Sequence, residues 1–223
     1  MSELIKAKEP FKFYARSHLT ELTGLRATTL GQLCGLIKTI LDACVYHHTH
    51  RFLQQHQYLS PEPPNDFAYW VTSVLGEREL GEQLSSVNII EYTTISSLRE
   101  RFIKIIDDYL SSNPLAKMRF SREGEEFHFM KSVSFILPTG YVVYDLKEFS
   151  QALSQITIDS IYFHMFEARL RLGKGTNDFS NWLDTSLGDK ELAESIADLD
   201  PYTYTLEELR KTVIKIVDMR LFG

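Results

Sequence analysis

The sequence has few cysteines and no basic excess, and each absence excludes a class of protein. Cys34 and Cys44 are its only cysteines, so neither a disulfide framework nor a cysteine-based zinc site can be assembled. Both lie in apolar, helix-like surroundings, which favours buried free thiols in a reducing compartment. The net charge of −6 argues against a nucleic-acid-binding surface, which normally carries excess Lys and Arg.

Long apolar segments are also missing. No stretch approaches the ~18 consecutive apolar residues of a transmembrane helix. Residues 1–10 are polar and charged and lack the apolar core of a signal peptide. We therefore expect a soluble, cytoplasmic protein. Its 223 residues, 43% of them hydrophobic, can bury a sizeable core in one domain or in two of about 110 residues.

Familiar catalytic motifs are absent as well. The sequence contains no Gly-x-Ser-x-Gly nucleophile, no dinucleotide fingerprint and no His-Glu-x-x-His metal motif. Gly173-Lys174-Gly175 lacks the spacing and the Ser or Thr of a phosphate-binding loop, and a helix end explains it better. An enzyme is therefore the less favoured interpretation, and no cofactor is expected.

What the sequence does contain is an internal repeat. The matching positions are Phe11 and Phe127, Tyr46 and Tyr162, His48 and His164, Asn65 and Asn177, Asp66 and Asp178, and Trp70 and Trp182. The first three pairs are 116 positions apart and the last three are 112 apart, so the first copy carries four extra residues between them. Such ordered matches indicate a duplication. The polar segment Ser111–Pro114 then predicts repeat units at 1–113 and 114–223, packed as one compact body.

Each repeat is predicted to be a small β-hairpin followed by about five helices. Thr23-Gly24 and Pro138-Thr139-Gly140 occupy the expected hairpin turns. Capping boxes at Thr29–Gln32 and Asp145–Glu148 then predict where the first helix of each repeat begins. The predicted fold is mainly α with small β-hairpins, an α+β protein of two tandem pseudo-symmetric repeats.

The repeated polar and aromatic residues are expected to serve the fold. His48 and His164 are predicted to be buried, with their ring nitrogens bonded to cap or backbone groups at the Asn-Asp motif. The Asn-Asp pairs are predicted to cap a helix, and the repeated Tyr and Trp residues to lie in the core. The alternative makes His48 a general base that Asp66 orients. A histidine present in both halves favours the structural role.

A metal site is the weaker interpretation of the histidine cluster. His47 and His50 share a helix face at i, i+3 and are the candidate ligands. No carboxylate stands at helical ligand spacing, and Phe163 and Phe166 replace these two histidines in the second repeat. We therefore expect no metal and keep His47 and His50 as the alternative.

Binding residues are sought instead among those that only the first repeat has. They are His47, His50, Arg51, His56 and Tyr58, next to the proline-rich segment 60–64. An exposed polyproline-like loop beside polar and aromatic side chains suits the binding of a partner or a small ligand.

The segment Tyr46–Trp70 also carries a resemblance. Its strings Tyr-His-His-Thr-His and Ser-Pro-Glu-Pro-Pro-Asn-Asp-Phe-Ala-Tyr-Trp closely resemble a bacterial family catalogued only as a domain of unknown function. The resemblance covers nearly the whole chain, since Leu19–Gly24 and Asn177–Trp182 fit it too. It implies no activity, because the family has none established. The repeated half also resembles a small domain appended to other microbial proteins, which favours modular binding by analogy alone.

Together these observations predict a cytoplasmic, non-enzymatic module for protein interaction or regulation, whose partner is an unidentified protein or small ligand. The alternative is a small-molecule-binding protein or a metal-assisted hydrolase that uses His47, His48, His50 and Asp66. Neither nucleic acid nor a membrane is an expected partner.

Overall fold

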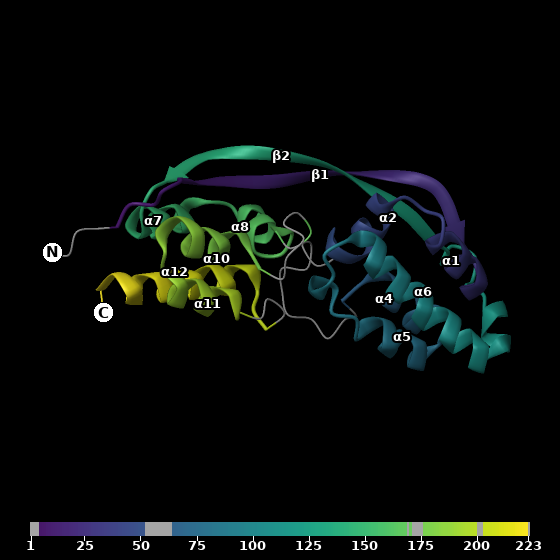
Figure 1. The fold of residues 1–223 in the computed structure, drawn as a ribbon. Coiled ribbons are helices and arrows are strands. Elements are labelled where there is room, and N and C mark those ends of the chain that lie inside the picture. The colour runs from purple at the N-terminus through teal and green to yellow at the C-terminus, as the bar shows by residue number, and fades with distance from the viewer. Residues whose placement is uncertain (1–4, 52–63, 169, 171–175, 200–202, 223) are drawn as a thin grey trace. The chain divides into compact units, whose positions relative to one another are not determined.

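The computed structural model describes residues 5–51, 64–168, 170, 176–199 and 203–222, which form two long strands and two groups of helices (Figure 1). The strands are β1 (Phe11–Ala27) and β2 (Phe127–Val143). Between them lie α1 (Leu30–Ile37), α2 (Asp42–Tyr46), a π-helix (His47–Arg51), α4 (Asp66–Ser73), α5 (Arg78–Ser85), a 3-10 turn (Ile89–Glu91), α6 (Ile95–Ser112) and a 3-10 helix (Pro114–Met118). After β2 come α7 (Leu146–Gln155), α8 (Ile158–Met165), α10 (Asp178–Trp182), a second π-helix (Leu183–Leu187), α11 (Lys190–Ala197) and α12 (Leu206–Phe222). The chain is thus an α+β protein.

The two strands form one antiparallel sheet, and the two hairpins predicted from the sequence are wrong. Each strand continues through its expected turn and pairs with the other strand, about 116 residues away in the chain. Gly24 and Gly140 keep the backbone of a tight bend, with φ of +78° and +83°. The preceding threonine hydroxyls hold the bend to the opposite strand, because Thr23 donates to the Phe129 carbonyl and Thr139 to the Phe13 carbonyl. The Thr-Gly pairs therefore bend the strands without reversing them.

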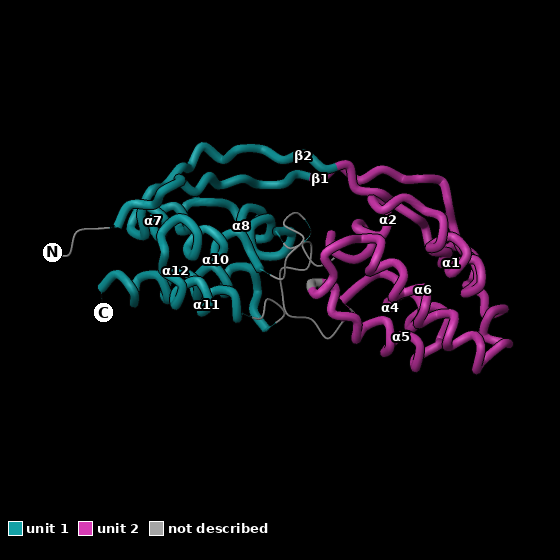
Figure 2. Tube along the Cα trace, viewed as in Figure 1, with its two compact units in different colours: residues 1–17, 57–59, 134–223 teal, residues 18–56, 60–133 magenta. Residues whose placement is uncertain are grey.

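The chain divides into two compact units (Figure 2). Among the described residues, unit 1 takes those up to Ser17 and those from Ser134 onward, and unit 2 takes those from His18 to Val133. The units therefore do not coincide with residues 1–113 and 114–223, the ranges predicted for the two repeats. Each unit combines the helices of one range with the first strand residues of the other.

In unit 2, the start of β2 completes the core of the helices that precede it in the chain. Phe127 stacks on Phe67 of α4 with ring centroids 5.4 Å apart, and Phe67 meets Phe102 of α6 edge-on at 5.5 Å. Phe129 is fully buried next to Phe127. The Phe-x-Phe alternation gives β2 one apolar face here, with His128 exposed between the two rings. Burial of these rings fixes the strand on unit 2.

Unit 1 has the same arrangement with the start of β1. Phe13 stacks on Phe149 of α7 at 5.6 Å, and Phe11 lies 5.4 Å from Phe179 of α10. Phe149 and Phe179 meet edge-on at 5.2 Å. The first strand residues of the chain thus belong to the core of the last helices, which no local sequence pattern indicates.

Helix starts follow the predicted capping chemistry. Thr29 and Asp145 accept from the backbone N–H three residues on, that of Gln32 and of Glu148 respectively. The return bonds reach one residue further back than in the standard capping box, from Gln32 to the Thr28 N–H and from Glu148 to the Tyr144 N–H. These caps fix the turn from each strand into the first helix after it.

Candidate functional site

His48 lies in the core of unit 2 with both ring nitrogens bonded. Its Nε2 is 3.0 Å from the backbone nitrogen of Met130 in β2, and its Nδ1 is 2.7 Å from the Asp66 carboxylate. A backbone N–H can only donate, so Nε2 is the acceptor and the ring proton on Nδ1 points at Asp66. The side chain is 1% exposed. His48 therefore holds β2 on the helices through Nε2 and contacts Asp66 through Nδ1.

His164 repeats this arrangement in unit 1. Its Nε2 accepts from the Tyr14 backbone N–H at 2.9 Å, and its Nδ1 is 2.6 Å from the Asp178 carboxylate. Tyr14 and Met130 are 116 positions apart, as are the two histidines. We call each set a strand clamp: His48, Asp66 and Met130 in unit 2, and His164, Asp178 and Tyr14 in unit 1.

The remaining repeated residues support the clamps in the same way in both units. Asn65 and Asn177 cap α4 and α10, each accepting from the backbone N–H three residues on. Trp70 donates to the Glu125 carbonyl and Trp182 to the Glu9 carbonyl, just before the first residue of each strand. Tyr46 and Tyr162 are buried, and each stacks on the residue four positions later. Each of these side chains thus bonds or packs within its own unit.

The residues that differ between the units surround His47. Its Nδ1 is 2.9 Å from the Ser132 hydroxyl, and burial lowers the pKa of His47 to about 4, with a smaller contribution from His48. In unit 1, Phe163 and Arg16 occupy the positions of His47 and Ser132, and Glu167 occupies the position of Arg51. There Arg16 forms an ion pair of 2.8 Å with the fully buried Glu167 and lies over the Phe163 ring. Unit 2 thus has the His47–Ser132 contact where unit 1 has Phe163 and Arg16, and a cation where unit 1 has the Glu167 carboxylate.

The candidate binding and metal-ligating residues that the structure describes have different neighbours. His50 stacks on Tyr46 and lies 3.1 Å from the Thr49 hydroxyl, whereas His47 faces Ser132. Arg51 is half-buried at the end of the π-helix. No group of three metal-ligating side chains occurs within the described ranges. His56, Tyr58 and the proline-rich segment 60–64 lie outside the described residues.

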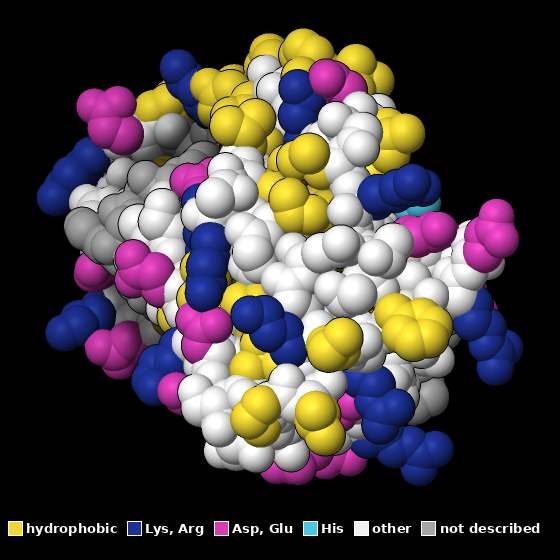
Figure 3. Space-filling view, turned by 90° about the vertical axis from the view of Figure 1, so that its right-hand side faces the viewer, with side chains coloured by type: hydrophobic (Ala, Val, Ile, Leu, Met, Phe, Trp, Pro, Cys, Tyr) yellow, Lys and Arg dark blue, Asp and Glu magenta, His cyan; other side chains and the backbone are white. Residues whose placement is uncertain are grey.

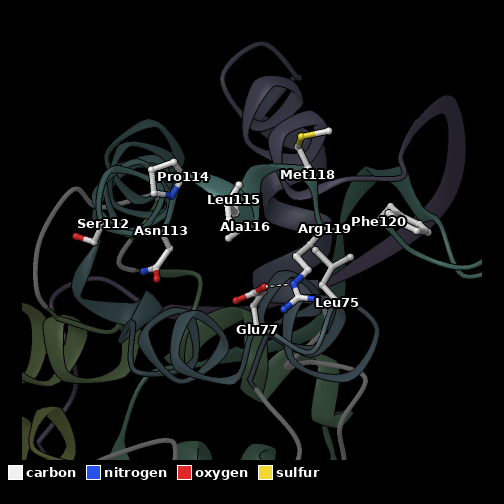
Figure 4. A pocket seen from close by; sticks show the side chains of 10 residues that line it. All are labelled: Leu75, Glu77, Ser112, Asn113, Pro114, Leu115, Ala116, Met118, Arg119 and Phe120. Carbon is white, nitrogen blue, oxygen red and sulfur yellow. Dashed lines mark hydrogen bonds and ion pairs between the residues drawn. The ribbon is translucent and has the colours of Figure 1, made fainter.

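Unit 2 has a pocket that the sequence did not indicate. Its volume is about 780 Å³, and its walls come from the connection between α4 and α5 and from the segment 112–120 (Figure 4). Three apolar side chains of this segment are largely exposed: Leu115 by 87%, Met118 by 75% and Phe120 by 75%. Figure 3 shows hydrophobic side chains reaching the surface between Lys and Arg side chains on the side from which it is viewed. Large exposed apolar clusters of this kind mark interaction sites.

A charged pair lies in the same pocket. Arg119 donates through Nε to Glu77 at 2.7 Å, next to Leu75 (Figure 4). The other oxygen of Glu77 accepts from the Tyr109 hydroxyl at 2.6 Å, and this hydrogen bond raises the pKa of Tyr109 to about 12. Both oxygens of Glu77 thus accept a hydrogen bond, while within the described residues the two terminal nitrogens of Arg119 make none. The pocket therefore offers an anchored guanidinium beside exposed apolar side chains.

The sequence does not predict a site in the segment 112–120, because its apolar residues follow neither a helical nor a strand period. It predicts only a boundary at Ser111–Pro114, and Glu123, Glu125 and Glu126 balance the charge of the basic residues that precede them. Three large apolar residues within six positions of a segment without periodicity were the available signal.

No helix in the described part of the chain is both long and apolar enough to cross a membrane.

Comparison with known proteins gives a family but no activity. No curated protein matches the sequence. A solved structure, "The structure of OrfY from Thermoproteus tenax", is similar over 97% of this chain and 98% of that one, with 30% identity and a TM-score of 0.81. The model of DUF5752, a family of unknown function, matches residues 8–218. The chain therefore belongs to this family.

Proposed function

We propose that the protein is a non-enzymatic interaction module, and that its pocket in unit 2 binds an apolar segment of a cytoplasmic partner protein that carries a carboxylate. One observation supports this proposal above the others. Leu115, Met118 and Phe120 are exposed together beside Arg119, whose terminal nitrogens have no hydrogen-bond partner among the described residues.

The apolar side chains supply the larger part of the binding energy. Full burial of three such side chains contributes roughly 5 to 9 kcal/mol before the cost of association. That cost leaves a micromolar or weaker complex if apolar contact acts alone. A carboxylate that binds the two terminal nitrogens of Arg119 adds a charge-assisted, bidentate pair of hydrogen bonds and sets the orientation of the bound segment.

On this proposal, only unit 2 carries the binding site, whereas the repeated residues stabilise the fold of both units. On this view the chain is an internal duplication that exchanges its first strands. The equivalent hydrogen bonds of His48 and His164, of Asn65 and Asn177, and of the two tryptophans support that view. After a duplication, one copy can keep the fold while the other acquires a binding surface.

Site-specific photocrosslinking tests the proposal. A photoreactive phenylalanine analogue replaces Leu115 in the native host, and the captured protein is identified by mass spectrometry. Met118→Asp and Arg119→Glu are each expected to abolish capture of that protein. Leu41→Asp is the matched control, since Leu41 is also an exposed leucine of unit 2, at 63%, but lies outside the pocket.

The proposal fails if capture survives both pocket variants, or if Leu41→Asp reduces it equally. Circular dichroism on each variant separates loss of binding from loss of fold, because all three positions are on the surface.

A further inference from the structure

Helix α12 has a second apolar stripe besides the one that faces the core of unit 1. Its inner face contains Leu209, Val213 and Val217, all fully buried. The outer stripe lines an open groove of about 800 Å³ and consists of Lys211, Ile214, Lys215, Asp218, Met219 and Phe222. These positions recur at the spacing of three and four that keeps side chains on one face of a helix. Met219 and Phe222 are 57% and 82% exposed.

We propose that this stripe pairs with α12 of a second copy of the chain, antiparallel and about a two-fold axis. An axis between positions 216 and 217 places Lys215 opposite the partner's Asp218 and Ile214 opposite the partner's Met219. It also places the Lys211 stem against the partner's Phe222, as lysine stems and aromatic rings commonly pack. Each contact occurs twice, because a two-fold interface is self-complementary.

The charges of Lys215 and Asp218 favour the antiparallel arrangement. The central contacts join opposite charges only when the helices are antiparallel, since a parallel pair would oppose Lys215 to itself. Asp218 is held in place by the Ser150 hydroxyl of α7, at 2.6 Å. Within the described residues Lys215 forms no ion pair, so its charge is available to a partner. The arrangement thus pairs Lys215 and Asp218, two of the three charges of the stripe, and covers its apolar side chains.

A single helix face is smaller than the roughly 800 Å² per partner of a standard interface. We therefore expect a reversible dimer whose population rises with protein concentration in the micromolar range. The pocket of unit 2 takes no part in it, so Met118→Asp is expected to leave the dimer unchanged.

Charge reversal tests the pairing by sedimentation-velocity ultracentrifugation. Lys215→Glu and Asp218→Lys each turn both central contacts repulsive, and each is expected to weaken the dimer at least about tenfold. Mixing the two variants restores opposite charges at both contacts of the mixed dimer and is expected to recover wild-type association. Lys190→Glu, an equal change of charge on α11, is the control and should have no effect.

The rescue by mixing does not depend on how stable either variant is alone, since both are present in the mixture. A wild-type chain that stays monomeric throughout the micromolar range overturns the proposal. So does a dimer that both reversals leave intact, or a mixture that associates no better than its components.

Discussion

Replacing His48 by alanine should destabilise unit 2 through two separable effects. The change removes a fully buried ring that packs against both Phe67 and Phe127, and it leaves the Met130 N–H without its acceptor. An orphaned buried donor costs about 1 to 3 kcal/mol, and an incompletely refilled cavity adds about 2 more. Asp66 adds little, because its side chain is 28% exposed and regains water. We expect a total loss of about 3 to 5 kcal/mol in the free energy of unfolding.

His48→Phe separates these effects. Phenylalanine fills most of the space but accepts no hydrogen bond, so this variant should lose only the polar part, about 1 to 3 kcal/mol. The difference between the alanine and phenylalanine variants then measures the cavity. Hydrogen exchange at the Met130 amide should accelerate in both variants, because both lack its acceptor.

Each unit contains one tryptophan, which makes the assay specific. Trp70 reports on unit 2 and Trp182 on unit 1, so urea unfolding followed in a Trp182→Phe background isolates the affected unit. His164→Ala, measured with Trp182 as the reporter, should give a loss of similar size, since its distances match those of His48. A His48→Ala loss below about 1 kcal/mol, or an unchanged exchange rate at Met130, would show that the clamp does not hold the strand.

Four further variants probe other parts of unit 2. The unfolded chain protonates His47 near 6.5 and the folded chain near 4, so stability should fall by about 3 kcal/mol as pH drops between these values. Urea titrations at several pH values should show a flatter curve for the double variant His47→Phe with Ser132→Ala. Gly35→Ala should raise the melting temperature by removing a flexible residue from an open helix face, whereas Gly81→Ala should lower it, since the added methyl group collides with a threonine hydroxyl. Tyr109→Phe should cost about 1 to 2 kcal/mol in urea unfolding and abolish the phenol titration near pH 12 in the ultraviolet spectrum.

The helix boundaries were predictable because their causes are local. Thr29, Asn65, Asp145 and Asn177 each cap a helix through a bond to a residue three positions on, which a single sequence displays. The pairing of the strands was not predictable in this way. Thr23-Gly24 and its counterpart satisfy the local rules for a turn, but the competing partner for each strand lies in the other half of the chain. Pairing of that kind depends on the burial of phenylalanine rings in a distant core, and a turn motif does not report it.

The candidate site was likewise predictable only where its causes are local in the sequence. The sequence indicated that His48 and His164 share one role, because they recur with their aspartates, but it did not indicate that each accepts from a strand 82 or 150 residues away. The sequence did not predict the pocket, for a different reason. Its residues come from the connection between α4 and α5 and from the segment 112–120, which lacks periodicity, so only the folded chain brings Glu77 and Arg119 together.

The histidine-rich motif itself has a structural explanation in the comparison of the two units. Where unit 1 has Phe163 and the Arg16–Glu167 ion pair, unit 2 has His47, Ser132 and Arg51. Removing one partner of a buried ion pair is costly, because the other charge then stays buried without compensation. On the proposed duplication, the two charged positions and the neighbouring aromatic position therefore changed together. His47 then supplies a polar partner for Ser132, and it does so as a neutral side chain with a lowered pKa. Coordinated repacking of this kind accounts for an extra histidine in one unit without a metal or a substrate.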